Sequence, residues 1–291
     1  MTAAQTTTDT PHTGRAALWM IGAIVSFSSM AVAGRAISLE LDTFEIMLYR
    51  SLIGIVIVLS AVRLMGQTVA LRNLPLHGLR NIAHFTGQNL WFYAVATAPL
   101  AQVFALEFTT PIWALLLAPL VLGERITRRG ALAALIGFAG VLIVARPGVV
   151  DLTPGLISAA LSAVGFGLTA LLTRKLTRTE NVASILLLLV LFQAAFGAIC
   201  AAYDGDVAIP SIAALPYVSV IAVAGLVAHL CLTNALSLAP AAQVMPLDFV
   251  RLPLIAIVGM ALYSEPLEPL VFAGGAVIVA ANWINLRRSS R

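Results

Sequence analysis

The chain has 291 residues, of which 60% are hydrophobic and only 10% are charged, and its mean hydropathy is +0.98. Since an ordinary soluble domain carries about 25% charged residues, this composition excludes a soluble protein and indicates a polytopic membrane protein. The net charge of +4 does not indicate a nucleic-acid partner, because the basic residues lie at the ends of apolar segments.

The apolar segments predict ten membrane-spanning helices. Residues 1–14 are polar and rich in Thr, which predicts a disordered tail, and the apolar segment that follows is expected to remain as an uncleaved helix. A spanning helix needs about 20 mostly apolar residues. The predicted spans are 16–34, 43–65, 78–97, 99–121, 129–146, 153–173, 181–203, 211–236, 240–263 and 268–286.

The Lys and Arg residues fall mainly on one side of the membrane when these spans alternate in direction. With the N-terminus inside, 13 of the 17 basic residues are cytoplasmic, and Arg80 at the start of the third span is counted among them. Arg35 and Arg146 are external, while Arg50 and Arg251 lie within spans. This asymmetry follows the positive-inside rule and predicts that both termini are cytoplasmic.

Two segments of the chain resemble each other at an offset of 141 residues. Residues 99–124 and 240–265 align without a gap and share 7 of 26 residues, including a Gln and the terminal Glu. The offset divides the spans into a first five-helix repeat, 15–148, and a second, 149–291. Because five is odd, the second repeat enters the membrane from the opposite side, which is the inverted-topology repeat of many secondary transporters.

One acidic residue of each repeat lies in the middle of a span, where a carboxylate costs several kcal/mol. Glu107 aligns with Asp248, and substrates and coupling ions bind near the midplane between inverted repeats. The two acids are therefore candidate coupling or gating groups. The alternative is a structural ion pair, since Arg251 follows Asp248 by three residues and lies on the same helical face; Arg50 is a second such partner.

Polar and aromatic side chains in the third and eighth spans are candidates for substrate binding. His84, Gln88 and Trp91 recur at helical spacing and share one face of their helix. Polar side chains in a span usually face the bundle rather than lipid, although some only form hydrogen bonds between helices. The candidate substrate-binding residues are His84, Gln88, Trp91, Tyr93, His229 and Asn234 in these two spans, together with Trp113 of the fourth span and Phe166 of the sixth.

The fourth and ninth spans each contain prolines and are followed closely by a glutamate. Pro111 and Pro253 are expected to kink these helices. Glu124 and Glu265 lie at the membrane edges and are expected to form hydrogen bonds at helix ends rather than to bind substrate.

The first of these repeats resembles a known family. Pro111, the pair Gly123-Glu124 and the small-residue helix "RRGALAALIGFAG" are similar to the repeat of EamA-type carriers, which belong to the drug/metabolite transporter superfamily. The second repeat departs from the pattern, because Pro253 is shifted by one position and Ser264 replaces the Gly. The resemblance implies an all-α basket of ten helices in a bacterial inner membrane. Spans 1, 3, 4, 6, 8 and 9 would surround a central cavity, with spans 5 and 10 to one side.

The resemblance also implies a function. Among such carriers the chain looks closest to amino-acid exporters, including those for aromatic amino acids, so the expected activity is secondary transport of amino acids or related small metabolites by alternating access. The alternative is an exporter of hydrophobic drugs or nucleoside-like metabolites. The expected partners are a small-molecule substrate and the lipid bilayer. The sequence leaves the substrate, proton coupling, net direction and oligomeric state open, a monomer being one alternative.

The chain lacks the sequence motifs of other classes of membrane protein. The chain has no His-Glu-x-x-His zinc motif and no Gly-x-Ser-x-Gly elbow, and its loops are too short for a catalytic domain, so no enzyme activity, metal or cofactor is expected. A retinal protein needs a lysine within a span, whereas the single lysine is Lys175 in a predicted loop. A channel is retained as an alternative function, although the repeat favours a carrier.

Overall fold

The computed structural model describes residues 13–70, 72–123, 126–146, 151–203, 205–239 and 244–286, and all regular structure in these residues is helical. Most of the predicted tail and Glu124 lie outside them. The first half contains α1 (Thr13–Ile37), α2 (Thr43–Leu64), α3 (Leu74–Thr97), α4 (Leu100–Glu107), α5 (Thr110–Leu122) and α6 (Arg128–Ala145). The second half contains α7 (Pro154–Leu176), α8 (Val182–Ala201), α9 (Leu215–Leu238), the 3-10 helix η1 (Met245–Val250), α11 (Arg251–Tyr263) and α12 (Pro269–Leu286).

Each predicted span corresponds to helix in the structure, and six segments are long and apolar enough to cross a membrane. The chain is therefore a multi-pass membrane protein. The six are Gly14–Ile37, Thr43–Leu64, Leu100–Leu122, Pro154–Leu176, Val182–Ala201 and Leu215–Leu238. The third predicted span forms the 24-residue helix α3, which is more polar. The apolar stretches within α6, α11 and α12 are shorter, so the crossing of all ten stays a prediction.

Helix starts near the loops are fixed by side-chain caps. Asp42 accepts a hydrogen bond from the backbone N–H of Glu45 at 2.7 Å, and the Glu45 carboxylate accepts from the N–H of Asp42 at 2.9 Å, which is a capping box. Thr127, Thr153 and Asn181 cap α6, α7 and α8 in the same way with one hydrogen bond each. These caps satisfy backbone N–H groups that the helix itself leaves without a partner.

The fourth span is broken in its middle by the sequence "FTTP". Pro111 has no N–H to donate to the carbonyl of Glu107, and the Thr110 hydroxyl donates to that carbonyl instead, at 2.6 Å. The Thr109 hydroxyl likewise donates to the Leu106 carbonyl at 2.7 Å. Hydroxyls thus satisfy the backbone where the helix is interrupted, as a low-dielectric surrounding requires. Near the second proline, Pro253, the 3-10 helix η1 gives way to α11 at Arg251. The kinks expected at Pro111 and Pro253 stay a prediction.

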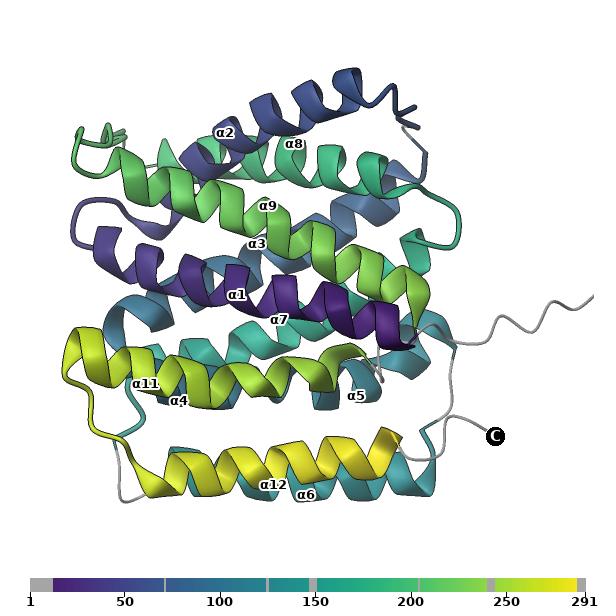
Figure 1. Ribbon diagram of the computed structural model, residues 1–291, viewed down its shortest axis with the longest axis vertical. Helices are drawn as coiled ribbons and strands as arrows, with labels where there is room; N and C mark the ends of the chain where they lie inside the picture. The colour runs from purple at the N-terminus through teal and green to yellow at the C-terminus, as the bar shows by residue number, and fades with distance from the viewer. Residues whose placement is uncertain are drawn as a thin grey trace, which may run out of the picture.

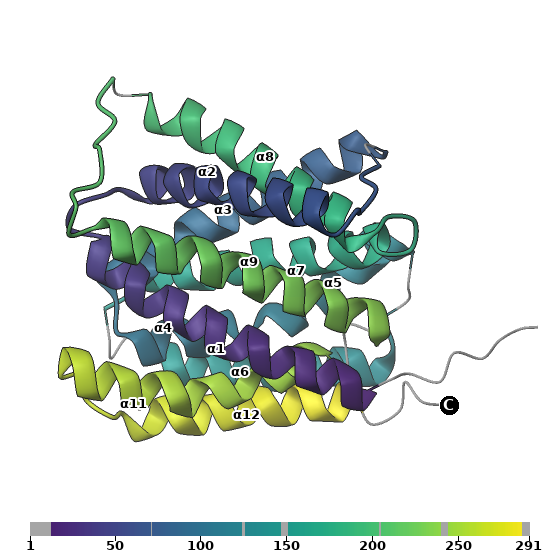
Figure 2. The same ribbon diagram turned by 45° about the horizontal axis from the view of Figure 1, so that its top comes forward.

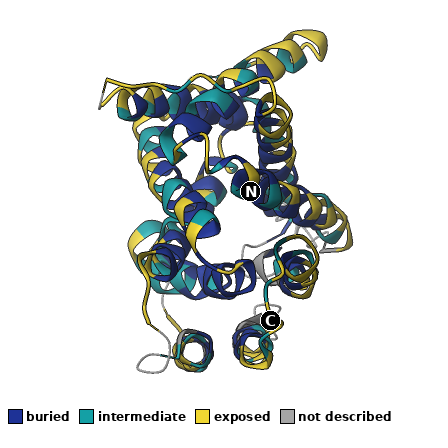
Figure 3. Cartoon of the chain, turned by 90° about the vertical axis from the view of Figure 1, so that its left-hand side faces the viewer, coloured by how far each residue is buried: buried dark blue, intermediate teal, exposed yellow. Residues whose placement is uncertain are grey.

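The helices pack mainly in pairs that join the two halves of the chain. α1 lies along α9, α3 along α7, and α2 along α8, and α6 lies along α12 (Figures 1 and 2). Figure 3 shows the last pair to one side of the others, as the family resemblance implied. Because each pair takes one helix from each half, neither half forms its core without the other.

The α6–α12 pair depends on glycines at the point of closest approach. A Cβ added to Gly274 would lie 2.7 Å from the backbone oxygen of Gly140 and 2.5 Å from Val144 Cγ2. Small residues of this kind let membrane helices approach closely.

We expect Gly274→Ala to destabilise the protein by about 1–3 kcal/mol, the usual range for overpacking, because its Cβ meets backbone that cannot move without separating the helices. Gly78→Ala is the matched control, since its Cβ would meet only Phe192 at 3.9 Å. Thermal unfolding in detergent measures both. Equal midpoints for the two variants would contradict the close packing.

Candidate substrate cavity

A central cavity lies between α1, α3, α7, α9 and the broken fourth and ninth spans. It contains about 840 Å³ of space not filled by atoms, its opening included. About 70 Å³ of this space is open to the centre of a water-sized sphere, which is room for a few water molecules. The lining residues are Met20, Phe27, Met30, Arg80, His84, Gln88, Trp91, Glu107, Phe108, Thr110, Pro111, Phe166, Thr169, Ala170, Thr173, His229, Leu232, Thr233, Asp248 and Arg251.

The buried guanidinium of Arg251 connects the two acidic residues. Its Nη2 donates to Glu107 Oε1 at 2.5 Å and to Asp248 Oδ2 at 2.5 Å, while Trp91 Nε1 donates to Glu107 Oε2 at 2.7 Å. Arg251 is only 1% exposed. The ion pair with Asp248, which the sequence offered as the structural alternative for this acid, is present. The pairing with Glu107 joins the middle of the first half to the middle of the second.

Aromatic rings hold the same guanidinium from other sides. Its carbon lies 4.7 Å from the ring centroid of Phe104, 5.1 Å from that of Phe27 and 5.6 Å from that of Phe108, distances at which a cation is attracted to a ring face. The helix breaks supply this arrangement, because Glu107 ends α4 and Arg251 begins α11.

Several polar atoms of the cavity wall have no hydrogen-bond partner among the described residues. Arg251 has two such donors, Nε and Nη1, and Gln88 contributes a third, Nε2. The acceptor Asp248 Oδ1 also has no hydrogen-bond partner among the described residues. Since buried polar groups are nearly always paired, the wall offers donors and one acceptor to a polar ligand.

His84 of α3 and His229 of α9 are in contact across the cavity. Their Nε2 atoms are 2.9 Å apart, and both side chains are buried. A neutral imidazole has one donor and one acceptor nitrogen, so one Nε2 donates while the other accepts. If both rings were protonated, both Nε2 atoms would carry hydrogen and this contact would break.

The structure brings most of the predicted site residues together. His84, Gln88, Trp91, Phe166, His229, Glu107 and Asp248 all line the cavity. Three others lie away from its lining. Tyr93 is 42% exposed, Asn234 donates to the carbonyl of Leu230 at 2.8 Å, and the Trp113 ring packs edge-on against Phe138 of α6.

Arg80 is the main cavity residue that sequence reasoning placed elsewhere. The alternation of spans put it at the cytoplasmic membrane edge, but α3 begins at Leu74, four residues before the predicted start, and the Arg80 side chain is buried and lines the cavity. A signal was available, because Arg80 precedes His84 by one helical turn and continues the polar face that the sequence predicted.

Arg35 and Glu265 hold one end of the bundle together. The two residues form an ion pair, Glu265 accepts from the N–H of Leu100 at 2.9 Å, and Arg35 donates to the carbonyl of Ala98 at 3.1 Å. Glu265 thus forms hydrogen bonds at a helix end, as predicted. In the second half Arg174 donates to the carbonyl of Ala239 at 3.1 Å.

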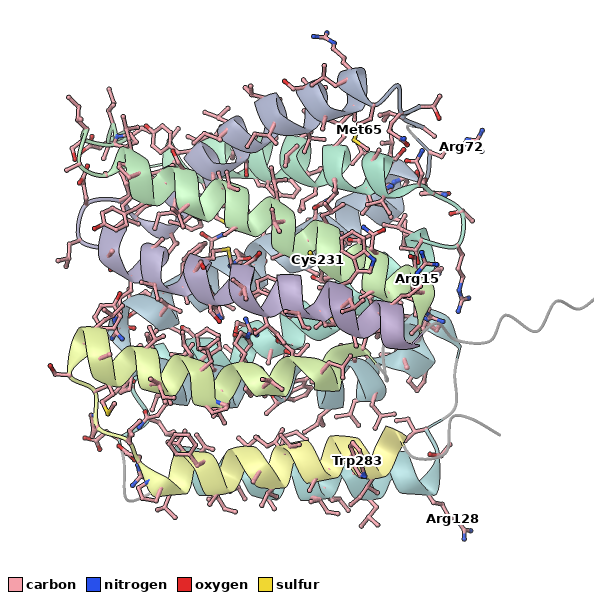
Figure 4. All side chains as sticks on the ribbon, viewed as in Figure 1. Arg15, Met65, Arg72, Arg128, Cys231 and Trp283 are labelled. Atoms are coloured by element: carbon pink, nitrogen blue, oxygen red, sulfur yellow. The ribbon has the colours of Figure 1, made fainter. Side chains whose placement is uncertain are left out.

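The opposite end of the bundle carries exposed basic side chains. Arg15, Arg72 and Arg128 all lie there, as Figure 4 shows. The lining residues of α9, His229, Leu232 and Thr233, belong to its C-terminal half, which runs to this end beside the start of α1 (Figure 1).

A family model describes the two halves separately. The model of the EamA-like transporter family matches residues 14–146 and again residues 153–287. The chain belongs to the EamA-like transporter family. It is therefore a membrane transporter, and the expected membership of the EamA-type carriers is confirmed.

Named relatives of this EamA-like chain differ in what they transport. It is 24% identical over 264 residues to an S-adenosylmethionine uptake transporter of Rickettsia bellii, covering 90% of each chain. It is 30% identical to a riboflavin transporter of Brucella anthropi, over 77% of this chain and 81% of the relative. A pseudopaline exporter of Pseudomonas aeruginosa is 26% identical, over 88% and 90% respectively. None of these three is named an amino-acid exporter, so the expected resemblance to amino-acid exporters in particular is not supported.

A solved structure shares the fold. A crystal structure superposes with a TM-score of 0.71 at 18% identity, covering 96% of this chain and 99% of the other.

We expect Arg251→Met to destabilise the protein by about 3–5 kcal/mol, because removing one partner leaves buried carboxylates without compensation. The triple variant Arg251→Met, Glu107→Gln, Asp248→Asn removes all three charges and should recover much of that loss. Size-exclusion chromatography after heating in detergent measures both. A triple variant no more stable than the single one would show that the ion pairs do not dominate the energetics of the cluster.

Proposed function

We propose that this transporter moves amino acids, or small metabolites that contain an amino-acid group, across the bacterial inner membrane through the central cavity. The observation that carries the proposal is the set of polar cavity atoms on Arg251, Gln88 and Asp248 that have no hydrogen-bond partner among the described residues. Three donors, two on Arg251 and one on Gln88, suit a carboxylate, and the acceptor Asp248 Oδ1 suits an ammonium group. A zwitterion matches both.

The remainder of the wall suits the side chain of such a solute. Phe27, Trp91, Phe108 and Phe166 line the cavity together with methionines. Apolar walls with a few placed polar groups are typical of small-molecule sites. S-adenosylmethionine, named for the Rickettsia relative, contains an α-amino carboxylate, which supports an amino-acid group as the shared feature.

Glu107 and Asp248 act as gating groups in this proposal. Both hold Arg251, and Glu107 does so from the other half of the chain. A substrate carboxylate that binds Arg251 competes with Glu107 for the same cation, so binding weakens a connection between the halves. A ligand that favours one arrangement in this way shifts the population toward it.

We further propose that the halves are inverted five-helix repeats that exchange access between the two membrane faces. The pairing supports this, because α1 with α9 becomes α7 with α3 when the halves are exchanged, while the α2–α8 and α6–α12 pairs map onto themselves. The hydrogen bond from Arg35 to the carbonyl of Ala98 has a counterpart in that from Arg174 to the carbonyl of Ala239, since the two acceptors are 141 residues apart and the two donors 139. Rocking of such halves is the usual route of alternating access.

Orientation and direction follow from the charges in this proposal. The basic end with Arg15, Arg72 and Arg128 is assigned to the cytoplasm by the positive-inside rule, which places both termini there. The Arg35–Glu265 end then faces outward. A cavity whose lining extends toward the cytoplasmic end is suited to loading from the cytoplasm, which favours export.

We expect the purified protein in liposomes, preloaded with a labelled amino-acid mixture, to release a subset of them with saturable kinetics and with counterflow. Gln88→Leu should raise the half-saturating concentration about tenfold or more, since a hydrogen bond to a charged group contributes about 1.5–3 kcal/mol. Efflux of each amino acid is measured by mass spectrometry.

Tyr93→Phe is the control for that experiment, because the Tyr93 side chain lies away from the cavity lining; its kinetics should match those of the native chain. Methyl esters of the released amino acids, which lack the carboxylate charge, should not be transported. Failure to release any amino acid would contradict the proposed substrate class. Flux that does not saturate with concentration would indicate a channel.

A second candidate is a flat heteroaromatic solute, within the nucleoside-like alternative. The four aromatic rings of the wall and the riboflavin transporter of Brucella anthropi among the relatives favour it. Riboflavin fluorescence inside the same liposomes tests this directly: saturable loss of riboflavin without amino-acid efflux would put this candidate first.

A further inference from the structure

A second group of basic side chains lies one to two helical turns from Gln88 along the α3 face of the cavity. Arg80 and His84 belong to α3, and His229 meets His84 from α9 at 2.9 Å. All three line the cavity. Arg80 is 1% exposed, so its charge is removed from bulk solvent.

Neutral groups hold the Arg80 guanidinium. Its Nε donates to Thr173 Oγ1 at 3.2 Å, and its Nη1 donates to Asn81 Oδ1 at 3.1 Å. Gln193 Nε2 in turn donates to Asn81 Oδ1 at 3.2 Å. These bonds orient the guanidinium and leave its charge uncompensated. In the part of the chain that the structure describes, no carboxylate lies within ion-pair distance of Arg80.

A second buried arginine adds positive charge behind the histidines. Arg50 of α2 lies against α9, where a Cβ on Gly225 would be 3.2 Å from its Nη2, and Gly225 precedes His229 by one turn. Arg50 and His229 also line one small pocket. The described residues give Arg50 a contact with Met30 Sδ at 3.8 Å and no carboxylate partner.

The charges of the cavity wall balance in sum, with Arg80 and Arg251 against Glu107 and Asp248, but they are unevenly placed. The Arg251 cluster contains one cation and two carboxylates, whereas Arg80, with Arg50 behind the histidines, has no acid within ion-pair distance among the described residues. A buried charge without a partner is strongly unfavourable, and an ionisable group in a membrane segment that faces a cavity is a candidate ligand site. The missing partner is an anion.

We propose that Arg80, His84 and His229, with the charge of Arg50 behind them, bind a second carboxylate of the transported solute. The inference rests on the proposed function, because it takes the first carboxylate to lie at Arg251 and Gln88. It narrows the substrate class to amino acids that carry a carboxylate at the far end of the side chain. Gln88 follows His84 by four residues and Arg80 by eight, so the two subsites are roughly 6–12 Å apart along α3.

Competition in liposomes tests the second subsite with full-length protein. The tracer is an amino acid that the native protein releases, and the competitors are L-2-aminoadipate and L-norleucine, which differ in a terminal carboxylate. We expect aminoadipate to compete at a concentration at least tenfold lower than norleucine. Arg80→Gln should abolish this preference and leave competition by norleucine within about twofold, while Arg80→Lys, which keeps the charge, should retain part of it.

Arg63→Gln is the matched control, because Arg63 is an exposed arginine of α2 outside the cavity lining; it should retain the full preference. The thermal midpoint of Arg80→Gln, measured in parallel, should not fall, since no ion pair is broken. Equal competition by the two compounds in the native protein, or an unchanged preference in Arg80→Gln, would overturn the second subsite while norleucine competition still supports the proposed function. Stronger competition by O-phospho-L-serine than by aminoadipate would overturn the assignment to a carboxylate.

Discussion

The ion pairs of Arg251 constrain the centre of the molecule more than any other interaction. A charged group in an apolar interior is tolerated when it is paired, and Arg251 meets carboxylates from both halves of the chain within 2.5 Å. The fourth and ninth spans must therefore place Glu107, Asp248 and Arg251 at one depth. Their helices are interrupted at that depth, so that a helix end and a helix start are available where the charges meet.

The two interruptions are built from different residues at aligned positions. Thr110 of the first half closes its break through a hydroxyl bond to the Glu107 carbonyl, and the position aligned with Thr110 in the second half is Arg251. At this aligned position the first half thus supplies a hydroxyl that satisfies a backbone carbonyl, and the second half supplies the cation. The asymmetry gives a cavity that is not the same for its two halves, which is what an unsymmetrical solute such as an amino acid requires.

Much of the architecture could be predicted from the sequence, because apolar segments, prolines and the 141-residue offset are local or periodic signals. The polar face of His84, Gln88 and Trp91 was predictable for the same reason. Arg80 was not assigned to the cavity, because counting arginines by loop cannot distinguish a membrane edge from a cavity wall one turn deeper. Asn234 and Tyr93 were included on the strength of their polarity, although each is rotated away from the faces that carry His229 and Trp91. The contact of Trp91 with Glu107 depends on tertiary packing that no local pattern encodes.

The pairing of Glu107 with an arginine 144 residues later also bears on how the protein is made. Ribosomes add roughly 5–20 residues per second, so Glu107 enters the translocation machinery several seconds before its partner exists. During that interval Trp91 is the one residue in the described part of the first half that donates a side-chain hydrogen bond to this carboxylate. The first half is then an intermediate whose buried acid lacks its cation, and its residence in the bilayer depends on the insertion machinery until α11 arrives.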